Sequence, residues 1–403
     1  MCSSDLTFKH KEILIMHDNL RVNRIIVNLS AAVFECKSGR CSGIYITRRF
    51  TFMAQKYVAY VGSYTYYGSS KGISIMDVDV EKGIFTKRKE VSVNNSSYLV
   101  ASRNNKYLYS VVDEGVAAFK ILPDGDLEYL NTASIRGMRT CYLTVDKAGK
   151  FLVTAGYHDG KMTILNINED GSVGSIASEI FDHGTGTIGE RNFRPHVTCV
   201  QFTPDEKFLC MVDTGLDNIK AYRFDHSNGH LTLADIIHCE LNSAPLRMLF
   251  SKDDRHMYMI SELKNYVTVY NYLPHPNEPE FQFKQLVSTL PKKYDEQSAA
   301  CAMQFTSDDK YLFCSNAGDN SFALYERDPE NGLLYMKCVL PISGDFPKHI
   351  SVFPDNKHVA SINKNSNSIT FFTVDYEKGL LVMNGRPLNV DTPNCCKIVP
   401  IEG

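Results

Sequence analysis

The sequence contains no tryptophan, no long basic run and no apolar segment close to the roughly 20 residues that span a bilayer. Without tryptophan, the chain cannot be built from repeats that end in Trp-Asp. Without a basic run, and with a net charge of −3, nothing favours a nucleic-acid partner. Neither Cys-x-x-Cys nor a His-rich spacing indicates a metal site. We therefore expect no nucleic acid, membrane, metal or cofactor partner.

The twelve cysteines are scattered along the chain, and the one adjacent pair is Cys395 and Cys396. Several fall inside expected strands, as Cys199, Cys210 and Cys314 do. This spacing favours reduced, buried side chains over a disulfide framework. Residues 1–52 also lack the charged, apolar and small-residue order of a signal peptide. We expect a cytoplasmic protein.

Residues 198–224, TCVQFTPDEKFLCMVDTGLDNIKAYRF, show the pattern from which most of the chain is built. Three short apolar runs are separated by a Thr-Pro-Asp-Glu turn and by a turn centred on Gly215. This order predicts a meander of three strands. In several copies an Asp/Asn-Gly-apolar segment follows, and it predicts a less regular fourth, outer strand.

Each copy of the pattern places a basic residue just before its second apolar run. These anchors stand 44 to 57 residues apart, close to the spacing of propeller blades: Lys56, Lys106, Lys150, Lys207, Arg255, Lys310 and Lys357. A sheet of three or four strands cannot bury both of its faces alone, so each must stack on its neighbours, and a closed ring leaves no exposed end. We predict an all-β fold, a seven-bladed β-propeller.

The first copy lacks an inner strand before Lys56. Residues 395–401, CCKIVPI, are apolar and follow Thr392-Pro393-Asn394 as an inner strand follows its connector. We predict that this C-terminal strand pairs with the first blade, beside residues 57–62, and closes the ring. Residues 53–403 then form one propeller domain, and residues 1–52, which do not carry the repeat, form an N-terminal extension outside it. A misassigned start codon and a targeting or docking arm are both open for that extension.

Several motifs together resemble one known family. They are YVGSYT at residues 60–65, RNFRPH at 191–196, DTGLD at 213–217, SEL at 261–263 and SNAGDNS at 315–321. Over residues 57–401 the chain resembles the seven-bladed propeller lactonases, which include bacterial 6-phosphogluconolactonases and fungal carboxymuconate cyclases. The resemblance implies a metal-independent lactone hydrolase that acts on a sugar lactone in carbohydrate metabolism, within the pentose phosphate pathway.

The residue nine positions before each anchor should lie at one mouth of the channel, because inner strands line it. From the second copy onward these residues are Ser97, Cys141, Thr198, Leu246, Cys301 and Lys348. In the family that the chain resembles, these positions hold a cluster of His and Arg. Here Thr198 stands at the family's histidine, while Leu246 and Ala317 stand at two of its arginines. Whether these changes abolish activity is left open.

Other polar residues keep the family pattern. Glu262 matches the acid of an Asn-Glu-Leu motif, His196 the first histidine of Pro-His-x-His, and Lys348 replaces an arginine. Lactone hydrolysis needs a base that activates water and a positive or N–H-lined place for the oxyanion. We therefore expect Glu262 to be catalytic, with His196 as an alternative base, and Lys348 to bind the substrate together with Arg247.

Each of these assignments has a structural alternative. Glu262 would otherwise be a buried carboxylate bonded to blade backbones, His196 a packing residue, and Lys348 a solvated rim cation. Arg247 stands one residue out of register with the family arginine, and in a strand that turns its side chain to the other face. Its role in binding therefore requires that it lie in a loop.

Two further motifs have ordinary explanations. Residues 184–189 match GxGxxG, but no strand–helix unit surrounds them, so they indicate a glycine-rich connector. Asp213 and Asp217 flank Gly215, and such acids bond the backbone of their own turn.

Two functions fit these observations. The first is a lactone-ring hydrolase whose partner is a small-molecule lactone or sugar acid. The second is a catalytically lapsed propeller that binds a small anionic ligand or a protein through the same mouth, which the losses at Thr198, Leu246 and Ala317 favour. The particular lactone and the oligomeric state are open.

Overall fold

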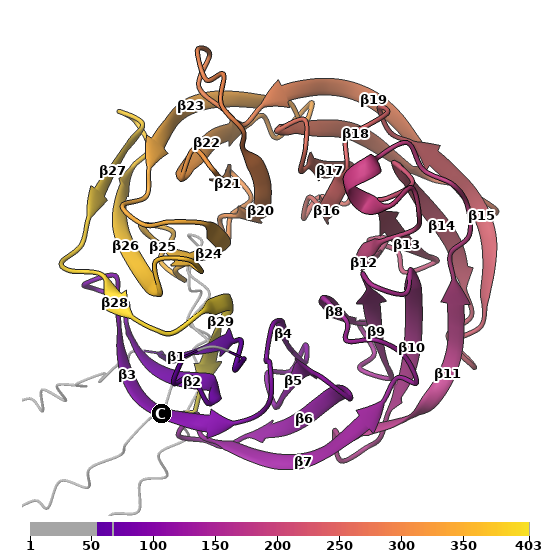
Figure 1. Cartoon of the computed structure of the whole chain (residues 1–403), viewed down its shortest axis with the longest axis horizontal. Helices are drawn as coiled ribbons and strands as arrows, with labels where there is room; N and C mark the ends of the chain where they lie inside the picture. The colour runs from indigo at the N-terminus through magenta and orange to yellow at the C-terminus, as the bar shows by residue number, and fades with distance from the viewer. Residues whose placement is uncertain (1–54, 67, 403) are drawn as a thin grey trace, which may run out of the picture. The chain divides into compact units, whose positions relative to one another are not determined.

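The seven basic anchors mark seven antiparallel sheets in the computed structural model, which describes residues 55–66 and 68–402. The predicted N-terminal extension lies outside the described residues. In each sheet the second strand begins at the anchor or directly after it. Figure 1 shows the sheets arranged as blades around a ring. The prediction of a seven-bladed β-propeller is confirmed.

Blade 1 combines the first strands with the last one. Its strands are β29 (Pro393–Ile401), β1 (Lys56–Ser63), β2 (Gly72–Asp79) and β3 (Ile84–Ser92). Strand β29 lies antiparallel to β1, with Lys56 opposite Ile401 and Gly62 opposite Cys395. The predicted closure of the ring is thus confirmed.

The other blades each contain consecutive strands, ordered from the axis outward. Blades 2 to 4 contain β4 (Leu99–Ala101), β5 (Tyr107–Val112), β6 (Gly115–Ile121) and β7 (Leu127–Ser134); β8 (Tyr142–Val145), β9 (Phe151–Gly156), β10 (Lys161–Ile167) and β11 (Val173–Phe181); β12 (Val197–Phe202), β13 (Phe208–Asp213), β14 (Asn218–Phe224) and β15 (Leu231–His238).

Blades 5 to 7 follow the same order, and blade 7 carries a short additional strand. Their strands are β16 (Pro245–Phe250), β17 (His256–Ser261), β18 (Tyr266–Pro274) and β19 (Pro279–Ser288); β20 (Ala299–Phe305), β21 (Tyr311–Ala317), β22 (Ser321–Arg327) and β23 (Leu334–Pro341); β24 (Pro347–Val352), β25 (His358–Asn363), β26 (Ser368–Asp375), β27 (Leu380–Met383) and β28 (Leu388–Asn389). One helical turn, η1 (Gly189–Arg191), lies between β11 and β12. Across the described part of the chain, no helix has the length and apolarity required to cross a bilayer.

The apolar core lies between blades rather than within one. Val58 and Ile75 of blade 1, for example, share a buried cluster with Leu108 and Phe119 of blade 2. The second and third strands are almost fully buried, as expected when sheets stack on both faces. The fourth strands alternate between covered and exposed residues, so they form the outer wall.

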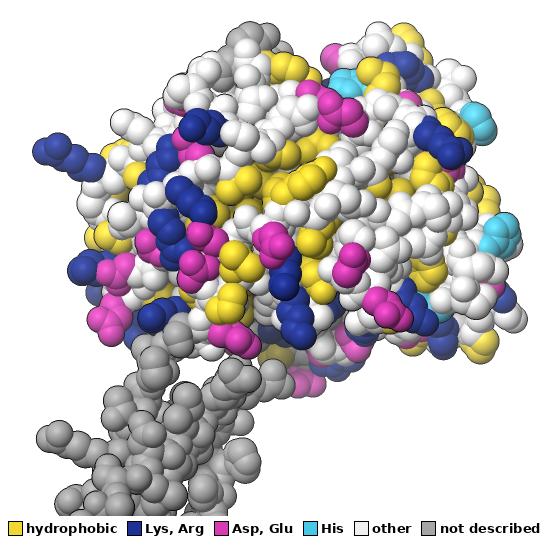
Figure 2. Space-filling view, turned by 90° about the horizontal axis from the view of Figure 1, so that it is seen from below, with side chains coloured by type: hydrophobic (Ala, Val, Ile, Leu, Met, Phe, Trp, Pro, Cys, Tyr) yellow, Lys and Arg dark blue, Asp and Glu magenta, His cyan; other side chains and the backbone are white. Residues whose placement is uncertain are grey.

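The outer surface mixes charges of both signs. On the side shown in Figure 2, Lys and Arg side chains lie among Asp, Glu and apolar side chains. Exposed ion pairs accompany this mixture, such as that of Lys89 with Asp126 at 2.6 Å. Exposed pairs contribute about 0–1 kcal/mol each, so the stacked apolar faces, not these pairs, hold the ring together.

A tyrosine in the second strand of several blades reaches the next blade. Tyr60 donates its hydroxyl to the carbonyl of Gly125 at 2.8 Å, and Tyr109 and Tyr258 make the same bond to Gly171 and Gly332. Each glycine occupies a positive-φ position in a turn between third and fourth strands. The Asp/Asn-Gly-apolar segments are therefore hairpin turns that also dock onto the preceding blade.

We expect Gly125→Ala to lower the free energy of unfolding by about 2–4 kcal/mol. An added Cβ would lie 2.5 Å from Val58 Cγ2 on blade 1, at a backbone φ of +85°, so strain in the backbone adds to overpacking between blades. Gly385→Ala is the matched control, because its φ is +71° and no atom lies within 4 Å of its Cβ position. Thermal unfolding of both variants measures the difference, and equal losses would contradict the docking role of the turn.

Candidate active site

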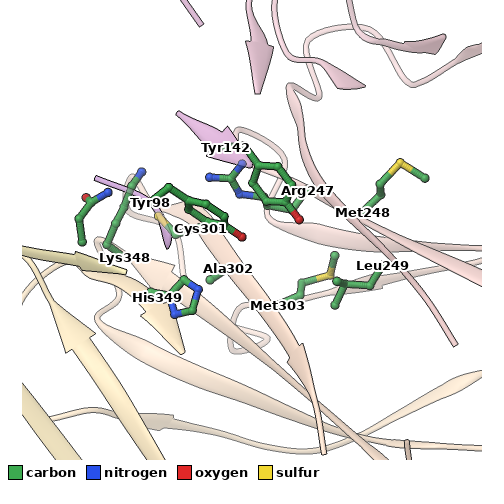
Figure 3. A pocket seen from close by; sticks show the side chains of 11 residues that line it. Tyr98, Tyr142, Arg247, Met248, Leu249, Cys301, Ala302, Met303, Lys348 and His349 are labelled. Atoms are coloured by element: carbon green, nitrogen blue, oxygen red, sulfur yellow. The ribbon is translucent and has the colours of Figure 1, made fainter. Parts of the chain in front are cut away.

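A cavity of about 60 Å³ lies among the inner strands of six blades. Figure 3 shows its lining side chains, with Tyr98 between Lys348 and the stacked pair of Arg247 and Tyr142. The lining also contains His349 and Asn394, while Leu249, Met303 and other apolar residues complete the wall. No Asp or Glu belongs to the lining in the part of the chain that the structure describes. The cavity is therefore suited to an anionic group.

A bulge in the inner strands determines which side chains reach this cavity. In β16, Pro245 pairs with Ser261 and Arg247 with the adjacent Ile260, which leaves Leu246 as an extra residue. Strands β12, β20, β24 and β29 contain the same irregularity, and their extra residues are Thr198, Cys301, Lys348 and Asn394. Because a bulge re-aims the residues around it, both the extra residue and its successor can face the axis.

The bulge corrects our reasoning about Arg247. This residue lies in a strand, not in a loop, and nevertheless lines the cavity because the extra Leu246 precedes it. Its guanidinium lies 4.6 Å from the ring centre of Tyr142 and 5.5 Å from that of Tyr98. It also donates to the carbonyl of Thr198. These contacts hold Arg247 rigidly and place its positive charge on the cavity wall.

His349 is a cavity residue that the sequence reasoning missed. Burial, with smaller contributions from the positive charges of Arg247 and Lys397, lowers the pKa of His349 to about 3. The ring is therefore neutral at physiological pH, and its buried Nδ1 atom has no hydrogen-bond partner among the described residues. Strict alternation along the strand would turn His349 away from the axis, so the sequence reasoning passed over it. The one signal that could have indicated it is its position directly after Lys348.

Asn394 supplies the seventh position of the ring that the sequence analysis began at Ser97. It is 8% exposed, and its Nδ2 atom donates to the carbonyl of Ser97 at 2.5 Å. Its Oδ1 atom is buried without a partner in the described structure. Extending the count of inner-strand positions to the closing strand would have found this residue.

Glu262 and His196 form a second cluster, at the end of the blades where the inner strands begin. Glu262 follows β17 and forms an ion pair with Arg191 of η1. His196 is 2% exposed and stacks on Tyr157 at 4.3 Å. The carbonyl of Arg191 lies 2.8 Å from His196 Nε2. Arg191 therefore connects the two predicted catalytic residues.

The ring nitrogens of His196 are both engaged. Nδ1 lies 2.7 Å from the carbonyl of Tyr157, and Nε2 faces that of Arg191. A carbonyl oxygen only accepts hydrogen bonds, so the ring nitrogen that carries the proton donates to its carbonyl, and the other nitrogen is covered by the second carbonyl. In this arrangement His196 positions the connector that carries Arg191.

The four predicted site residues thus fall into two groups. Arg247 and Lys348 line one cavity, whereas Glu262 and His196 do not belong to its lining. The Glu262 charge nevertheless acts on the cavity wall. Burial raises the pKa of the Cys301 thiol, the charge of Lys348 opposes this rise, and that of Glu262 adds to it. Cys301 is therefore a protonated wall residue between the two groups.

Residues 58–398 match the family model described as a lactonase with a seven-bladed β-propeller. The chain belongs to this lactonase family. It is 30% identical over 350 residues to the 6-phosphogluconolactonase of Bacillus subtilis, covering 85% of this chain and 99% of that protein. It is also 29% identical over 335 residues to the 6-phosphogluconolactonase of Formosa agariphila, and this match covers 80% of this chain and 94% of that protein.

Solved structures agree with this membership. A Bacteroides fragilis protein proposed to be a 6-phosphogluconolactonase superposes with a TM-score of 0.78 at 29% identity, over 86% of this chain and 98% of the other. The periplasmic gluconolactonase of Pseudomonas aeruginosa has a TM-score of 0.80 at 23% identity, over 86% and 99%. The latter similarity shows the fold alone. As a member of this family, the protein is a lactone hydrolase.

This lactonase departs from the family pattern where the sequence indicated. Thr198 is buried and hydrogen-bonded to Thr214 at 2.7 Å, and Leu246 packs into the blade core. Ala317 is 3% exposed at the end of β21. None of the three restores a charge, but Arg247 supplies a guanidinium one residue after Leu246.

The glycine-rich connector and the turn acids have the expected structural roles. Residues 184–189 form no strand–helix unit. Asp213 accepts bonds from the backbone N–H groups of Gly215 and Leu216, at 2.8 and 2.9 Å. Asp217 differs from expectation, because it accepts from Ala244 N at 2.8 Å and so bonds the next blade's connector.

We expect Asp213 to make stability fall as pH rises. Burial, together with the Asp182 carboxyl, raises the pKa of Asp213 to about 7. The folded state therefore holds a proton that the unfolded state releases near pH 4. The contribution of this proton to the free energy of unfolding is fully present below pH 4 and is lost as the pH rises to about 7. The melting temperature should decline over that interval.

Asp213→Asn should flatten this decline, because an amide accepts the same backbone bonds and donates permanently toward Asp182. Asp235→Asn, at a partly exposed position on the outer strand β15, is the control and should leave the slope as in the wild type. Melting curves between pH 4.5 and 8 measure both. An unchanged slope in Asp213→Asn would contradict the assignment.

Proposed function

We propose that this protein hydrolyses an anionic sugar lactone, with 6-phosphogluconolactone as the substrate. The placement of Arg247 and Lys348 in one cavity without a described carboxylate carries this proposal. A fixed guanidinium and a flexible ammonium together suit a phosphate group. The names of the Bacillus and Formosa relatives support the same substrate.

Glu262 is the proposed base. It lies in the turn after β17, and its backbone is fixed by bonds to Ala244 O at 2.8 Å and from Ala300 N at 3.2 Å. Water adds to the lactone carbonyl carbon as its proton passes to Glu262. The ring C–O bond then breaks, the ring oxygen takes the proton, and the product is an open-chain sugar acid.

Arg191 is the proposed partner of the developing oxyanion. In this structure it pairs with Glu262 and lies 5.7 Å from the ring centre of Tyr157. When substrate occupies the site, the lactone oxygen can take the place of the Glu262 carboxylate as its anionic partner. This exchange frees Glu262 to accept a proton. His196 acts as a positioning residue that holds the connector of Arg191.

We place this reaction in carbohydrate metabolism, as the lactone-opening step of the pentose phosphate pathway, and in the cytoplasm. The nine cysteines of the described residues are all free, which supports a reducing compartment. Burial raises the pKa of several of these thiols, Cys395 to about 11 and Cys396 to about 12, so they remain unreactive there.

Lys348→Met should raise KM for 6-phosphogluconolactone roughly 10- to 100-fold, because a charged hydrogen bond contributes about 1.5–3 kcal/mol. Hydrolysis of unphosphorylated gluconolactone should change little, since that substrate offers no phosphate. Lys310→Met, at an exposed position outside the cavity, is the matched control. Steady-state kinetics on both substrates provide the measurement, and equal effects on the two lactones would remove Lys348 from phosphate binding.

Glu262→Gln should lower kcat at least 100-fold, measured after the spontaneous rate of hydrolysis has been subtracted. Positioned bases contribute about 10²–10⁴-fold to the rate. Glu240→Gln, whose carboxylate contacts Tyr266 at 3.0 Å instead, should retain activity. If wild type and Glu262→Gln accelerate hydrolysis equally, Glu262 is not the base. Tight binding of 6-phosphogluconate with no turnover by wild type would instead favour the lapsed propeller.

A further inference from the structure

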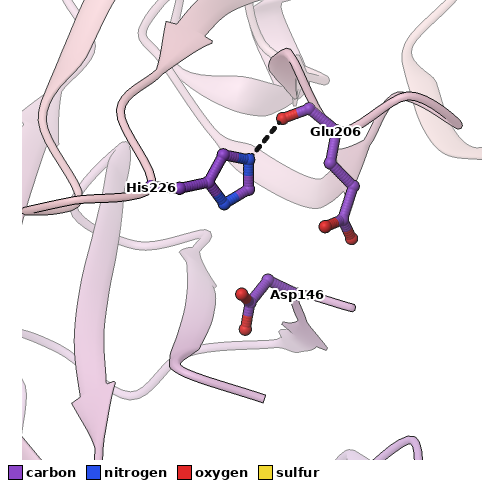
Figure 4. Close-up of side chains that lie close together, drawn as sticks. All are labelled: Asp146, Glu206 and His226. Carbon is purple, nitrogen blue, oxygen red and sulfur yellow. Dashed lines mark hydrogen bonds between the residues drawn. The ribbon is translucent and has the colours of Figure 1, made fainter. Parts of the chain in front are cut away.

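A polar cluster outside the candidate active site lies at the end of the propeller opposite Glu262, where the inner strands end. Asp146 belongs to the turn between β8 and β9, Glu206 to the turn between β12 and β13, and His226 follows β14. One ligand atom from each of these side chains lies within 4.8 Å of the other two. Figure 4 shows the Asp146 carboxylate facing the His226 ring and the Glu206 side chain across the junction of blades 3 and 4.

Asp146 brings an unpaired oxygen into this cluster. The residue is 0% exposed. Its Oδ1 atom accepts from the backbone N–H groups of Lys150 and Phe151, each at 2.8 Å. Its buried Oδ2 atom has no partner among the described residues. A buried carboxylate oxygen without a partner is costly, so this atom is available to a ligand that enters the cluster.

His226 presents a nitrogen in a defined state. Its Nε2 atom lies 2.8 Å from the carbonyl of Glu206, which can only accept, so Nε2 carries the proton. The remaining Nδ1 atom then has a free lone pair, and in Figure 4 it points toward Asp146. This is the arrangement in which a second bond orients a metal-binding imidazole.

Neither carboxylate of the cluster forms an ion pair with a Lys or Arg side chain among the described residues. Glu206 is 7% exposed, and its Oε1 atom accepts from Lys147 N at 2.7 Å. The ammonium of Lys147 donates to the carbonyl of Pro204 instead of to either carboxylate. Two carboxylates therefore face each other in a buried site, which is unfavourable without a cation.

The junction of blades 5 and 6 contains an arginine, and there Ser251 stands at the turn position that Asp146 occupies in blade 3. There the 5% exposed Arg327 binds Asp253 and lies 3.7 Å from Asp309. The backbone N–H of Arg327 bonds Lys310 O, just as that of Phe224 bonds Lys207 O, so the two positions are equivalent. The junction of blades 3 and 4 thus has Phe224 at the position where the junction of blades 5 and 6 has the guanidinium of Arg327.

We propose that Asp146, Glu206 and His226 bind a divalent transition-metal ion of the Zn²⁺ class at the junction of blades 3 and 4. One imidazole nitrogen and two carboxylate oxygens form a donor set that Zn²⁺ accepts, and water completes the coordination. Tetrahedral Zn²⁺ requires ligand atoms about 3.3–3.5 Å apart, so ligand atoms that lie up to 4.8 Å apart must approach one another. His226 is exposed, so its ring can move toward the two carboxylates.

The ligands come from three separate segments of two blades, which explains why no local spacing indicated a metal. The ion would pair with both carboxylates and join the two blades, at the end of the blades opposite Glu262. Lactone hydrolysis at Glu262 does not depend on this ion.

Calorimetric titration of the full-length, chelator-treated protein with ZnCl₂ tests the proposal. We expect one equivalent to bind and to raise the melting temperature. Asp146→Asn and His226→Ala should each weaken binding at least tenfold, whereas His275→Ala, an exposed histidine paired with Glu280, should not. Asp146→Asn keeps the acceptor for its turn and should fold.

Co²⁺ substitution separates this site from binding by cysteine. The bound ion should lack a thiolate charge-transfer band, because its ligands are nitrogen and oxygen. A thiolate band, no stoichiometric binding by wild type, or wild-type affinity in His226→Ala would each overturn the proposal. Loss of lactonase activity plays no part in this test, so it is independent of the proposed function.

Discussion

The structure depends on the fact that every four-stranded sheet has two apolar faces. Neither face can be covered by the sheet itself, so each blade obtains its core from the blades on both sides. A row of such sheets would leave two uncovered ends, and the pairing of β29 with β1 removes them. Hydrophobic burial of this kind is proportional to area, so closure of the ring contributes to the stability of all blades at once.

The site depends on a smaller device, the extra residue near the start of the inner strands. A regular strand would send alternate side chains to opposite faces. With one extra residue, adjacent side chains such as Lys348 and His349 both reach the axial cavity. The bulges therefore concentrate polar groups where the strands converge, without removing the apolar residues that hold the blades together.

Much of the fold could be predicted from the sequence because its signals are local and repeated. The basic anchors, the turn acids and the apolar runs recur in each blade, and the missing inner strand before Lys56 indicated where β29 must lie. The lysine of the cavity was predicted on the same basis, since Lys348 occupies a ring position. Arg247 was expected to reach the channel from a loop, but it lines the cavity from a strand, because period-two alternation does not reveal a bulge.

The contacts of Glu262 and His196, and the cluster around Asp146, could not be predicted, because they join segments that are distant in the sequence. The ion pair of Arg191 with Glu262 joins a connector to a turn 71 residues further along the chain. The contacts of His196 with carbonyl oxygens are visible only once the connector is folded. The three groups around Asp146 come from separate turns, and no composition or spacing brings them together.

The position of Asn394 has a consequence for biosynthesis. This residue belongs to the strand that closes the ring, and it also forms part of the cavity wall beside Ser97. A ribosome makes that strand after all the other blades. The pocket is therefore incomplete on the nascent chain, and its last wall arrives together with the seal of the ring. Closure of the ring and completion of the cavity wall are one event.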